Sequence, residues 1–472
     1  METLLAICQF LFTIIGDLFG AIVDAFSPQS GFDAKIAPER TIGSKVNKGI
    51  PYSRSRRLRK KTSYQNVLIT GTTGSGKTTK LLIPTLFSLR HTSLVINDPS
   101  KELFTITSGA LSKHFVIKTL NFSDSKSSSG YNILSRIRQP QDINKIAHLL
   151  VATTLDRGNS DPFWSLSVKS LLQIFISLTL HQEEQFRNMA NVVHLIHVFS
   201  AYPERIDMLV AKASDEALTL AYKSFIATPE KTLQNIVASA KAALEIFQSP
   251  EVAKVTSFDS IDFDLFRQQP IALYLHISLG DQRFLSCLIS IFFEQLYGYM
   301  LERVPKKSEL DCFCILDEAS SLYIPLLPLA CANGRKNRLG TVVAVQSKGQ
   351  LKTFYKDEAE NIAANCVTKI HLAGLTAIDE LREIETLSGK TIYKDKKGTE
   401  RVKPLITVDE IRLLPNNRSL IISGNKPIVK GRVSPYWRNL TFRKMAKIPP
   451  AQLRGDVPDS VVPLLPTNEN PK

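Results

Sequence analysis

Short apolar runs bounded by polar residues follow residue 66 of this 472-residue chain, and helical patterns lie between them. The first three runs are Val67–Thr70, Ser93–Asn97 and Phe115–Leu120. Their length and their content of β-branched residues are typical of strands that are buried in a parallel sheet. Because helical patterns separate them, we predict an α/β fold.

The strand-like runs stop between about residues 163 and 265. Apolar residues recur there at helical spacing, most clearly Leu233, Ile236, Val237, Ala240, Ala243, Leu244 and Phe247. Thr228 and Pro229, just before this set, are typical of a helix start. Strand-like runs then resume at Ile271–Ile277, Cys312–Leu316, Thr341–Val345, Val367–His371 and Ser419–Ile422. The simplest account is one α/β domain, residues 63–162 and 266–445, interrupted by an all-α domain, residues 163–265.

The N-terminal segment, residues 1–26, is the most apolar part of the chain. Residues 3–26 contain no Lys or Arg, and Leu4–Val23 is 20 residues long with Asp17 as its only charge. Small and polar residues recur on one side at helical spacing, including Gly16 and Gly20. We predict one membrane-associated helix that either spans the bilayer or lies in its interface. A soluble amphipathic helix is the alternative. Basic residues follow the segment, so the main body is expected in the cytoplasm.

The formal net charge is +15, and much of it lies in the segment after the apolar helix. Residues 27–66 hold ten Lys or Arg against two acidic residues. This basic linker, residues 27–62, is either a solvated, flexible connection or a patch for nucleic acid or an anionic membrane surface. The six cysteines form no CxxC pair, which argues against a zinc site or a disulfide framework. Six prolines in residues 446–472 predict a disordered tail.

A phosphate-binding loop is the strongest chemical signal. The pattern Gly71-x-x-x-x-Gly76-Lys77-Thr78 follows a predicted strand and precedes an apolar helix. Backbone N–H groups of such a loop turn toward phosphate oxygens, and the helix N-terminus adds partial positive charge. Lys77 is expected to reach the β- and γ-phosphates, and Thr78 to ligate Mg²⁺. The predicted ATP-binding residues are Gly71, Thr72, Thr73, Gly74, Ser75, Gly76, Lys77, Thr78 and Thr79.

Two acids end the predicted strand Cys312–Leu316. Asp317 can hold the Mg²⁺ shell with Thr78, and Glu318 can polarise a water for attack on the γ-phosphate. A glutamate beside this aspartate favours an ATPase that uses water over a small-molecule kinase, which must exclude water. Gln346, at the end of another predicted strand, can report hydrolysis through a hydrogen bond, or it is an ordinary polar residue at a strand end.

Arginines lie just before that strand, in Gly334–Arg338. In ring ATPases an arginine from one subunit completes the neighbour's site. Arg335 or Arg338 could act in this way, or the turn could be a basic surface or face DNA.

Ordered motifs give the chain a family resemblance. They are GTTGSGKTTKLLIP (71–84), NDPSKELF (97–104), YNIL (131–134), DPFW (161–164), CILDEA (314–319), GRKNRLGTVVAVQSKGQL (334–351), LSGKT (387–391), LITVDEIRLLP (405–415) and NKPI (425–428). In this order the chain resembles the type IV secretion coupling proteins, the conjugative DNA-transfer ATPases of the TraG/TraD class. Ser100 and Lys101 depart from the family's phrase, so the roles of Asp98 and Lys101 stay open.

The resemblance implies a RecA-like P-loop domain with an all-α insert that assembles as a hexameric ring. It implies a DNA-stimulated ATPase that delivers relaxase-bound single-stranded DNA, or double-stranded DNA, to a type IV secretion channel at the cytoplasmic face of the inner membrane. Many members carry two N-terminal membrane spans, whereas this chain has at most one. Two alternatives stay open: a coupling ATPase whose cargo is protein effectors, and a nucleotide-binding receptor with little motor activity.

Overall fold

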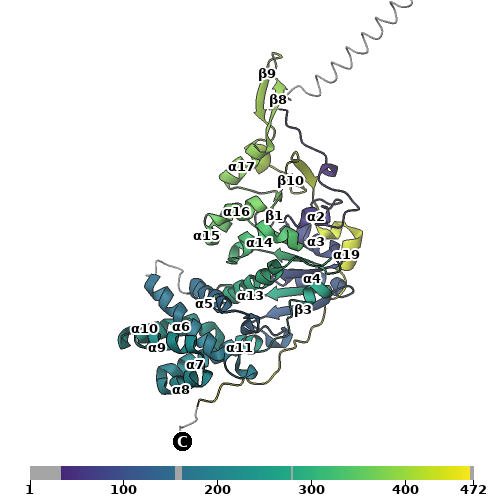
Figure 1. The fold of residues 1–472 in the computed structure, drawn as a ribbon. Helices are drawn as coiled ribbons and strands as arrows, with labels where there is room; N and C mark the ends of the chain where they lie inside the picture. The colour runs from purple at the N-terminus through teal and green to yellow at the C-terminus, as the bar shows by residue number, and fades with distance from the viewer. Residues whose placement is uncertain (1–32, 155–161, 278–279, 468–472) are drawn as a thin grey trace, which may run out of the picture.

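The computed structural model describes residues 33–154, 162–277 and 280–467. The predicted N-terminal membrane helix, within residues 1–26, lies outside the described residues, as does Asp161 of the DPFW phrase. In the described part, a sheet is flanked by helices, with a cluster of helices at one end and a two-stranded hairpin at the other (Figure 1). Two helices there are long and apolar enough to cross a membrane. They are α6 (Pro162–Leu180) and α13 (Gln282–Glu302), and 44% and 67% of these spans is buried within the protein.

The main sheet has nine strands within the described residues, in the order β11-β10-β7-β1-β6-β5-β2-β4-β3. All neighbours from β7 to β3 are parallel, and β10 and β11 run antiparallel at one edge. The strands are β1 (Val67–Thr70), β2 (Thr92–Asn97), β3 (Val116–Asn121), β4 (Ile271–His276), β5 (Asp311–Leu316), β6 (Leu339–Val345), β7 (Thr368–Leu372), β10 (Arg418–Ser423) and β11 (Val429–Arg432). The α/β prediction is therefore confirmed, and each predicted strand is present.

Both faces of the sheet are buried, which explains the continuous apolar runs. On β1, Val67 and Ile69 belong to one buried cluster and Leu68 to the other, because successive residues of a strand point to opposite faces. The helices α3 (Ile83–Ser88) and α4 (Glu102–Leu111) contribute to the first cluster. The second cluster includes residues of α13, α14 (Leu327–Asn333) and α16 (Glu358–Asn365). Because helices cover both faces of the sheet, the carboxyl ends of its parallel strands are held in fixed positions. We call this side of the sheet its carboxyl edge.

The helical region continues the second cluster. It contains α6, α7 (Met189–Ala201), α8 (Pro203–Ala213), α9 (Glu216–Ile226), α10 (Glu230–Ala243), α11 (Pro250–Ser257) and the short α12 (Leu265–Gln268). The helix α5 (Pro140–Thr154) packs against α6, α10 and α13. Helical structure of this region thus begins before residue 163. The apolar face of α10 that the sequence pattern singled out is buried, with Ile236, Val237 and Ala240 in the core.

The described part of the basic linker is folded against the sheet. Ile42, Ile50, Tyr52 and Leu58 are buried, and the Ile50 N–H donates to Ser63 Oγ at 3.0 Å just before β1. Bridges between residues 44, 51 and 57 close this segment into a compact turn. For residues 33–62 the interpretation as a solvated, flexible connection is wrong, because buried apolar residues anchor the chain, while its basic residues are exposed or half-buried.

The C-terminal segment also differs from the expectation of disorder. Residues 446–467 contain no helix or strand beyond α19 (Leu440–Met445), yet they run along the protein surface in contact with it (Figure 1). Their backbone passes so close to Gly109 that a Cβ there would lie 1.9 Å from the Pro449 carbonyl oxygen. Near its end, Leu465 is buried against the helical region. We call residues 446–467 the C-terminal strap.

One buried asparagine holds the end of the strap. Asn191 on α7 accepts the Leu465 N–H at 2.7 Å and donates to the Pro463 carbonyl at 3.0 Å, as a strand partner would. We expect Asn191→Ala to release this end, because loss of both bonds leaves two backbone groups without partners, at a cost of about 1–3 kcal/mol. Trypsin should then cut after the exposed Arg454 several-fold faster. The exposed Asn361→Ala serves as control, and unchanged cleavage in Asn191→Ala would contradict the clamp.

Candidate nucleotide-binding site

The P-loop lies between β1 and the helix that follows it. Gly74 and Gly76 have φ values of 79° and 88°, in the left-handed region that glycine enters without strain. Gly71 and Ser75 are buried at the base of the loop, whereas Thr73 and Gly74 are exposed at its tip. The remaining predicted residues of the loop, Thr72, Gly76, Thr78 and Thr79, are half-buried. The loop thus presents backbone N–H groups at the carboxyl edge of the sheet, which is where the sequence placed it.

Lys77 folds back over this loop. Only 9% of the residue is exposed, and its Nζ donates to the Gly71 carbonyl at 2.7 Å. Burial lowers the pKa of the Lys77 ammonium, and the carboxylates of Asp317 and Glu318 oppose this effect. A phosphate chain bound in the loop would bring further negative charge to the same ammonium.

The helix after the loop starts with a wide turn. Residues Thr78–Leu82 are π-helical and lead directly into α3, whose second residue is Pro84. Proline has no N–H to give to the carbonyl four residues earlier, and its ring crowds that carbonyl, so a wider turn relieves the clash. The first turn of the helix still points its N–H groups at the loop.

Thr78 and Asp317 come together from separate elements. Thr78 Oγ1 lies 3.4 Å from Asp317 Oδ2, although 239 residues separate them. Asp317 follows β5 and is held by Asn97, whose side-chain amide donates to the Asp317 carbonyl at 2.8 Å. Burial, with a contribution from the charge of Glu318, raises the pKa of Asp317 to about 6. A hydroxyl and a carboxylate at this spacing fit the oxygen ligands of Mg²⁺, and the cation would favour the ionised Asp317. Asn97 was not predicted.

Glu318 adopts an unusual backbone conformation. Its φ and ψ are 53° and 47°, in the left-handed region, which costs free energy for a residue with a Cβ. Its N–H donates to Asp317 Oδ1 at 3.1 Å, so the turn that displaces Glu318 also orients Asp317. Glu318 is half-buried and directly follows Asp317, which lies against Thr78.

Gln346 lies at the same edge of the sheet. It directly follows Val345, which pairs with Thr70 immediately before the P-loop. The Gln346 N–H donates to the Gln350 side chain at 3.2 Å, and this bond supports the loop after β6. The structure thus brings Lys77, Asp317, Glu318 and Gln346 to one edge.

The two candidate arginines lie at the opposite edge. They precede β6, and the eight residue steps from Arg338 to Gln346, at about 3.3 Å each, span roughly 26 Å. Arg338 donates to the carbonyls of Lys306 and Glu309 and lies 3.5 Å from Asp311 Oδ1. Arg335 is exposed, and its side chain has no polar partner among the described residues. Neither arginine reaches the P-loop of its own chain.

A buried polar network next to the P-loop was missed from the sequence. Thr70 Oγ1 lies 2.8 Å from His371 Nδ1 on β7, and His371 lies 3.6 Å from Glu380 on α17 (Ile378–Ser388). Glu380 also accepts the Lys348 N–H at 3.2 Å. Burial alone would raise the pKa of Glu380, but hydrogen bonds from His371 and Thr70 hold it below its usual value. The network joins the P-loop strand to the loop that carries Gln346.

Asp98, whose role the sequence left open, caps a helix. Its two carboxylate oxygens accept the N–H groups of Leu103 and Phe104 at 3.2 and 2.7 Å, in the first turn of α4. Burial raises the pKa of Asp98 to about 7, and these two bonds oppose the rise. Lys101 begins the same helix with a left-handed φ of 57°. Both residues thus shape the start of α4.

The comparisons with known proteins identify the family of the chain. A family model described as "Type IV secretory system Conjugative DNA transfer" matches residues 32–455. The chain belongs to this family. Among curated members it is similar to the conjugal transfer protein TraG of Escherichia coli, at 23% identity over 82% of this chain and 69% of TraG. It is also similar to VirD4 of Agrobacterium fabrum, at 22% identity over 43% of this chain and 33% of VirD4.

Solved structures of the conjugative coupling protein TrwB share the fold. The sulphate complex of TrwB superposes with a TM-score of 0.67, at 20% identity over 86% of this chain and 95% of the TrwB chain. A complex of TrwB with ADP and Mg²⁺ gives a TM-score of 0.66. The coupling-protein resemblance and the P-loop NTPase fold with a helical insert are confirmed for this family member.

Proposed function

We propose that this family member is a Mg²⁺-dependent ATPase that couples hydrolysis to the movement of DNA into a type IV secretion channel. The observation that carries the proposal is the meeting of Lys77, Thr78, Asp317 and Glu318 at one sheet edge. The family match supplies the process, conjugative DNA transfer. TrwB, with the same fold, binds ADP with Mg²⁺ and analogues of ATP and GTP.

In this proposal each residue has one task. The loop N–H groups and Lys77 bind the phosphates, and Thr78 and Asp317 would hold Mg²⁺, which would neutralise phosphate charge when bound. Glu318 orients a water and accepts its proton as the water attacks the γ-phosphate. Gln346 contacts the γ-phosphate, and Glu380 and His371 position the loop after β6. Hydrolysis would therefore change contacts at the end of β6 first.

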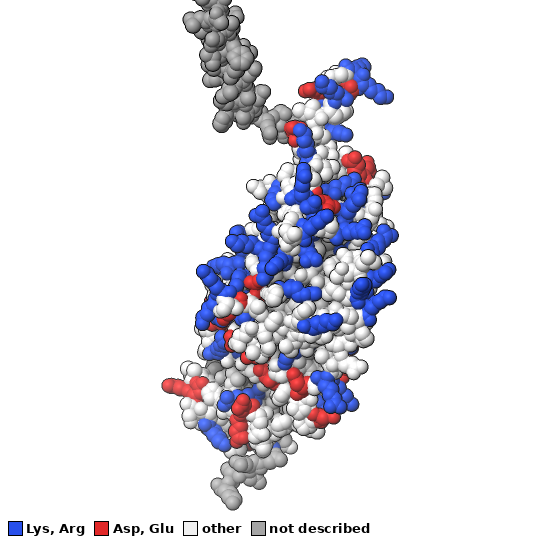
Figure 2. Space-filling view, turned by 90° about the vertical axis from the view of Figure 1, so that its right-hand side faces the viewer, with Lys and Arg blue, Asp and Glu red and all other residues white. Residues whose placement is uncertain are grey.

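The charge distribution suits a polyanionic cargo. Figure 2 views the protein from the side of α2 (Lys60–Ser63) and α19, and many Lys and Arg are spread among uncharged residues over this face. Acidic side chains lie mainly toward the helical end. Phosphate contacts by such residues attract DNA without reading its sequence. The DNA proposed is single-stranded and delivered by a relaxase.

The described chain begins at a basic hairpin. The hairpin joins β8 (Lys390–Lys394) to β9 (Glu400–Pro404), and its residues 390–404 hold six Lys or Arg against two acidic residues. The Ala34 N–H donates to the Lys390 carbonyl at 3.0 Å, so the first described residues lie beside this hairpin. The apolar segment, residues 1–26, precedes them in the sequence. If that segment is membrane-associated, the hairpin faces anionic headgroups. We therefore propose attachment at the cytoplasmic face of the inner membrane, next to the channel.

A homo-hexameric ring would place Arg335 against the P-loop of a neighbour. We expect Arg335→Ala and Lys77→Ala to be inactive alone, but mixtures should recover hydrolysis, because some interfaces then combine an intact Lys77 with an intact Arg335. DNA-stimulated phosphate release would be measured at fixed total protein.

The neighbouring exposed Lys336→Ala is the matched control and should hydrolyse ATP normally. Normal hydrolysis by Arg335→Ala, or no recovery in the mixture, would remove Arg335 from the site. A ring ATPase could then still operate with another residue in trans, whereas activity in Lys77→Ala itself would count against the ATPase proposal.

A further inference from the structure

A second basic cavity lies beside the P-loop helix. It has a volume of about 280 Å³ and is walled by three segments: residues 45–57, one face of the P-loop helix, and residues 434–442. Lys80, Pro84 and Ser88 form the helix wall, at intervals of four residues that place them on one side. The cations that line the cavity are Lys45, Arg54, Arg56, Arg57 and Lys80. The folded basic linker thus builds most of this wall.

The positive charge of this cavity is not balanced. Among the residues that the structure describes, no acidic one lines it. Glu39 is the carboxylate nearby, at 3.8 Å from Arg56 Nε, and it already accepts from Ser53 Oγ and from the Arg432 N–H. Among the described residues, the side chains of Arg54 and Arg57 have no polar partner. Burial lowers the pKa of Arg57, and burial together with Arg57 lowers that of Arg90. Of the five cations that line the cavity, Arg56 alone has a carboxylate within 4 Å among the described residues.

Ser88 supplies an independent observation. The residue is 7% exposed, and its Oγ has no hydrogen-bond partner in the described structure although the side chain lines the cavity. Buried hydroxyls are normally bonded, and an unbonded one costs free energy. The Ser88 hydroxyl and the neighbouring guanidinium groups can all donate hydrogen bonds, and phosphate oxygens can accept them.

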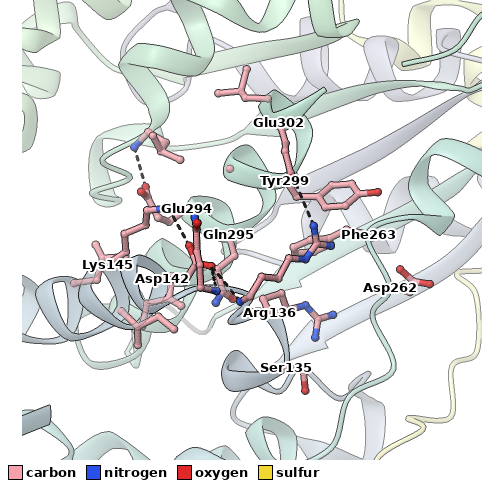
Figure 3. Close-up of a pocket in the computed structure, with 18 of the residues that line it drawn as sticks. Ser135, Arg136, Asp142, Lys145, Asp262, Phe263, Glu294, Gln295, Tyr299 and Glu302 are labelled. Atoms are coloured by element: carbon pink, nitrogen blue, oxygen red, sulfur yellow. Dashed lines mark hydrogen bonds and ion pairs between the residues drawn. The ribbon is translucent and has the colours of Figure 1, made fainter. Parts of the chain in front are cut away.

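A larger cavity elsewhere does not share this property. It has a volume of about 650 Å³ and lies between α5 and α13 (Figure 3). Its charged groups pair with one another: Arg138 with Glu302 at 3.2 Å, and Arg136 with Asp259. Glu294 accepts the Leu326 N–H at 2.8 Å. Paired groups indicate no particular ligand. The smaller cavity is the stronger candidate, because the side chains of Arg54, Arg57 and Ser88 in its wall have no polar partner among the described residues.

We propose that the cavity of Arg54, Arg57 and Ser88 is a second phosphate-binding site, separate from the P-loop. Its ligand is a phosphate group, from the backbone of single-stranded DNA or from a free nucleotide or phosphate ion. The DNA source rests on the proposed function, but the site itself does not.

Lys80 connects this site to the P-loop. Its Nζ donates to the carbonyl of Ser75 within the loop and to that of Asn416 at 2.9 Å. A phosphate in the cavity would attract the same ammonium. Phosphate binding in the cavity would therefore weaken the hydrogen bond from Lys80 to the Ser75 carbonyl and change the conformation of the P-loop. Through this contact, bound DNA could influence ATP hydrolysis.

The test uses the full-length protein with its P-loop saturated by ADP and Mg²⁺. Binding of a labelled single-stranded oligonucleotide is measured by anisotropy against salt, and binding of inorganic phosphate by thermal shift. Arg54→Ala/Arg57→Ala should weaken oligonucleotide binding at least about tenfold and flatten the salt dependence by about 1–1.5 in slope. Lys48→Ala/Arg59→Ala removes two exposed charges from the same segment, outside the cavity, and is the matched control.

Ser88→Ala keeps every charge and tests the cavity itself. It should weaken phosphate or oligonucleotide binding several-fold while the melting temperature without ligand stays the same or rises, because the lost hydroxyl has no partner there. If Ser88→Ala weakens binding of the oligonucleotide but not of inorganic phosphate, the ligand of the site is the DNA backbone. If it weakens binding of inorganic phosphate alone, the ligand is the free anion. Both results support the site.

Two results would overturn the site. One is that Lys48→Ala/Arg59→Ala weakens oligonucleotide binding as much as Arg54→Ala/Arg57→Ala does. The other is that neither cavity variant binds oligonucleotide or phosphate more weakly than the control does. Because these are binding measurements on ADP-loaded protein, they can succeed or fail whatever the hydrolysis assays show.

Discussion

Lys77→Ala is expected to lower DNA-stimulated ATP hydrolysis by at least about a hundredfold, the usual effect of removing one preorganised charge from a transition state. Lys77 Nζ lies 2.7 Å from the Gly71 carbonyl, so the ammonium is already inside the loop that would hold the phosphates. Nucleotide affinity should fall as well. The measurement is phosphate release with and without single-stranded DNA.

The substitution should not unfold the protein. Lys77 is buried and burial lowers the pKa of its ammonium, so replacing it with Ala removes a desolvated charge and should leave the melting temperature unchanged or raise it. The exposed Lys113→Ala is the control for loss of one positive charge. If wild type and Lys77→Ala hydrolyse ATP at equal rates, and neither rate changes with DNA, the proposed DNA motor is wrong.

Glu318→Gln should separate binding from chemistry. Gln has nearly the same shape and keeps the backbone bond to Asp317 Oδ1, but it cannot accept the proton of an attacking water. We expect turnover to fall by about 10²–10⁴-fold while ATP still binds about as well as to wild type. Turnover and the affinity of a fluorescent ATP analogue would be compared with those of Glu184→Gln, an exposed residue of the helical region.

The same variant makes a prediction about pH. The charge of Glu318 helps burial to raise the pKa of Asp317 to about 6, so removing it should lower that pKa. Asp317 would then stay ionised to lower pH, and Mg²⁺-dependent nucleotide binding should persist further below pH 6 than in wild type. If Glu318→Gln hydrolyses ATP normally, Glu318 is not the residue that activates water. If Glu318→Gln hydrolyses ATP slowly and still supports transfer, that result favours a nucleotide-binding receptor with little motor activity.

Some regions of secondary structure could not be read from the sequence for a physical reason. The hairpin β8–β9 has no buried side, so its residues show no apolar alternation; Tyr393 and Val402 are largely exposed. The strand β11 is short and half-polar. The C-terminal strap is Pro-rich and aperiodic, and its order comes from Asn191 and from the space above Gly109, both distant in sequence.

The sequence by itself determined the parallel sheet, the phosphate loop and its acidic partner, because burial periodicity and fixed motif spacing are local properties of the chain. Only the tertiary structure decided which polar groups meet. It placed Arg335 and Arg338 away from the P-loop of their own chain and joined Thr70 to His371 and Glu380. It also showed that residues 45–57 of the basic linker line a cavity together with Ser88. Those contacts depend on strand order and on packing between distant segments, and no local pattern records them.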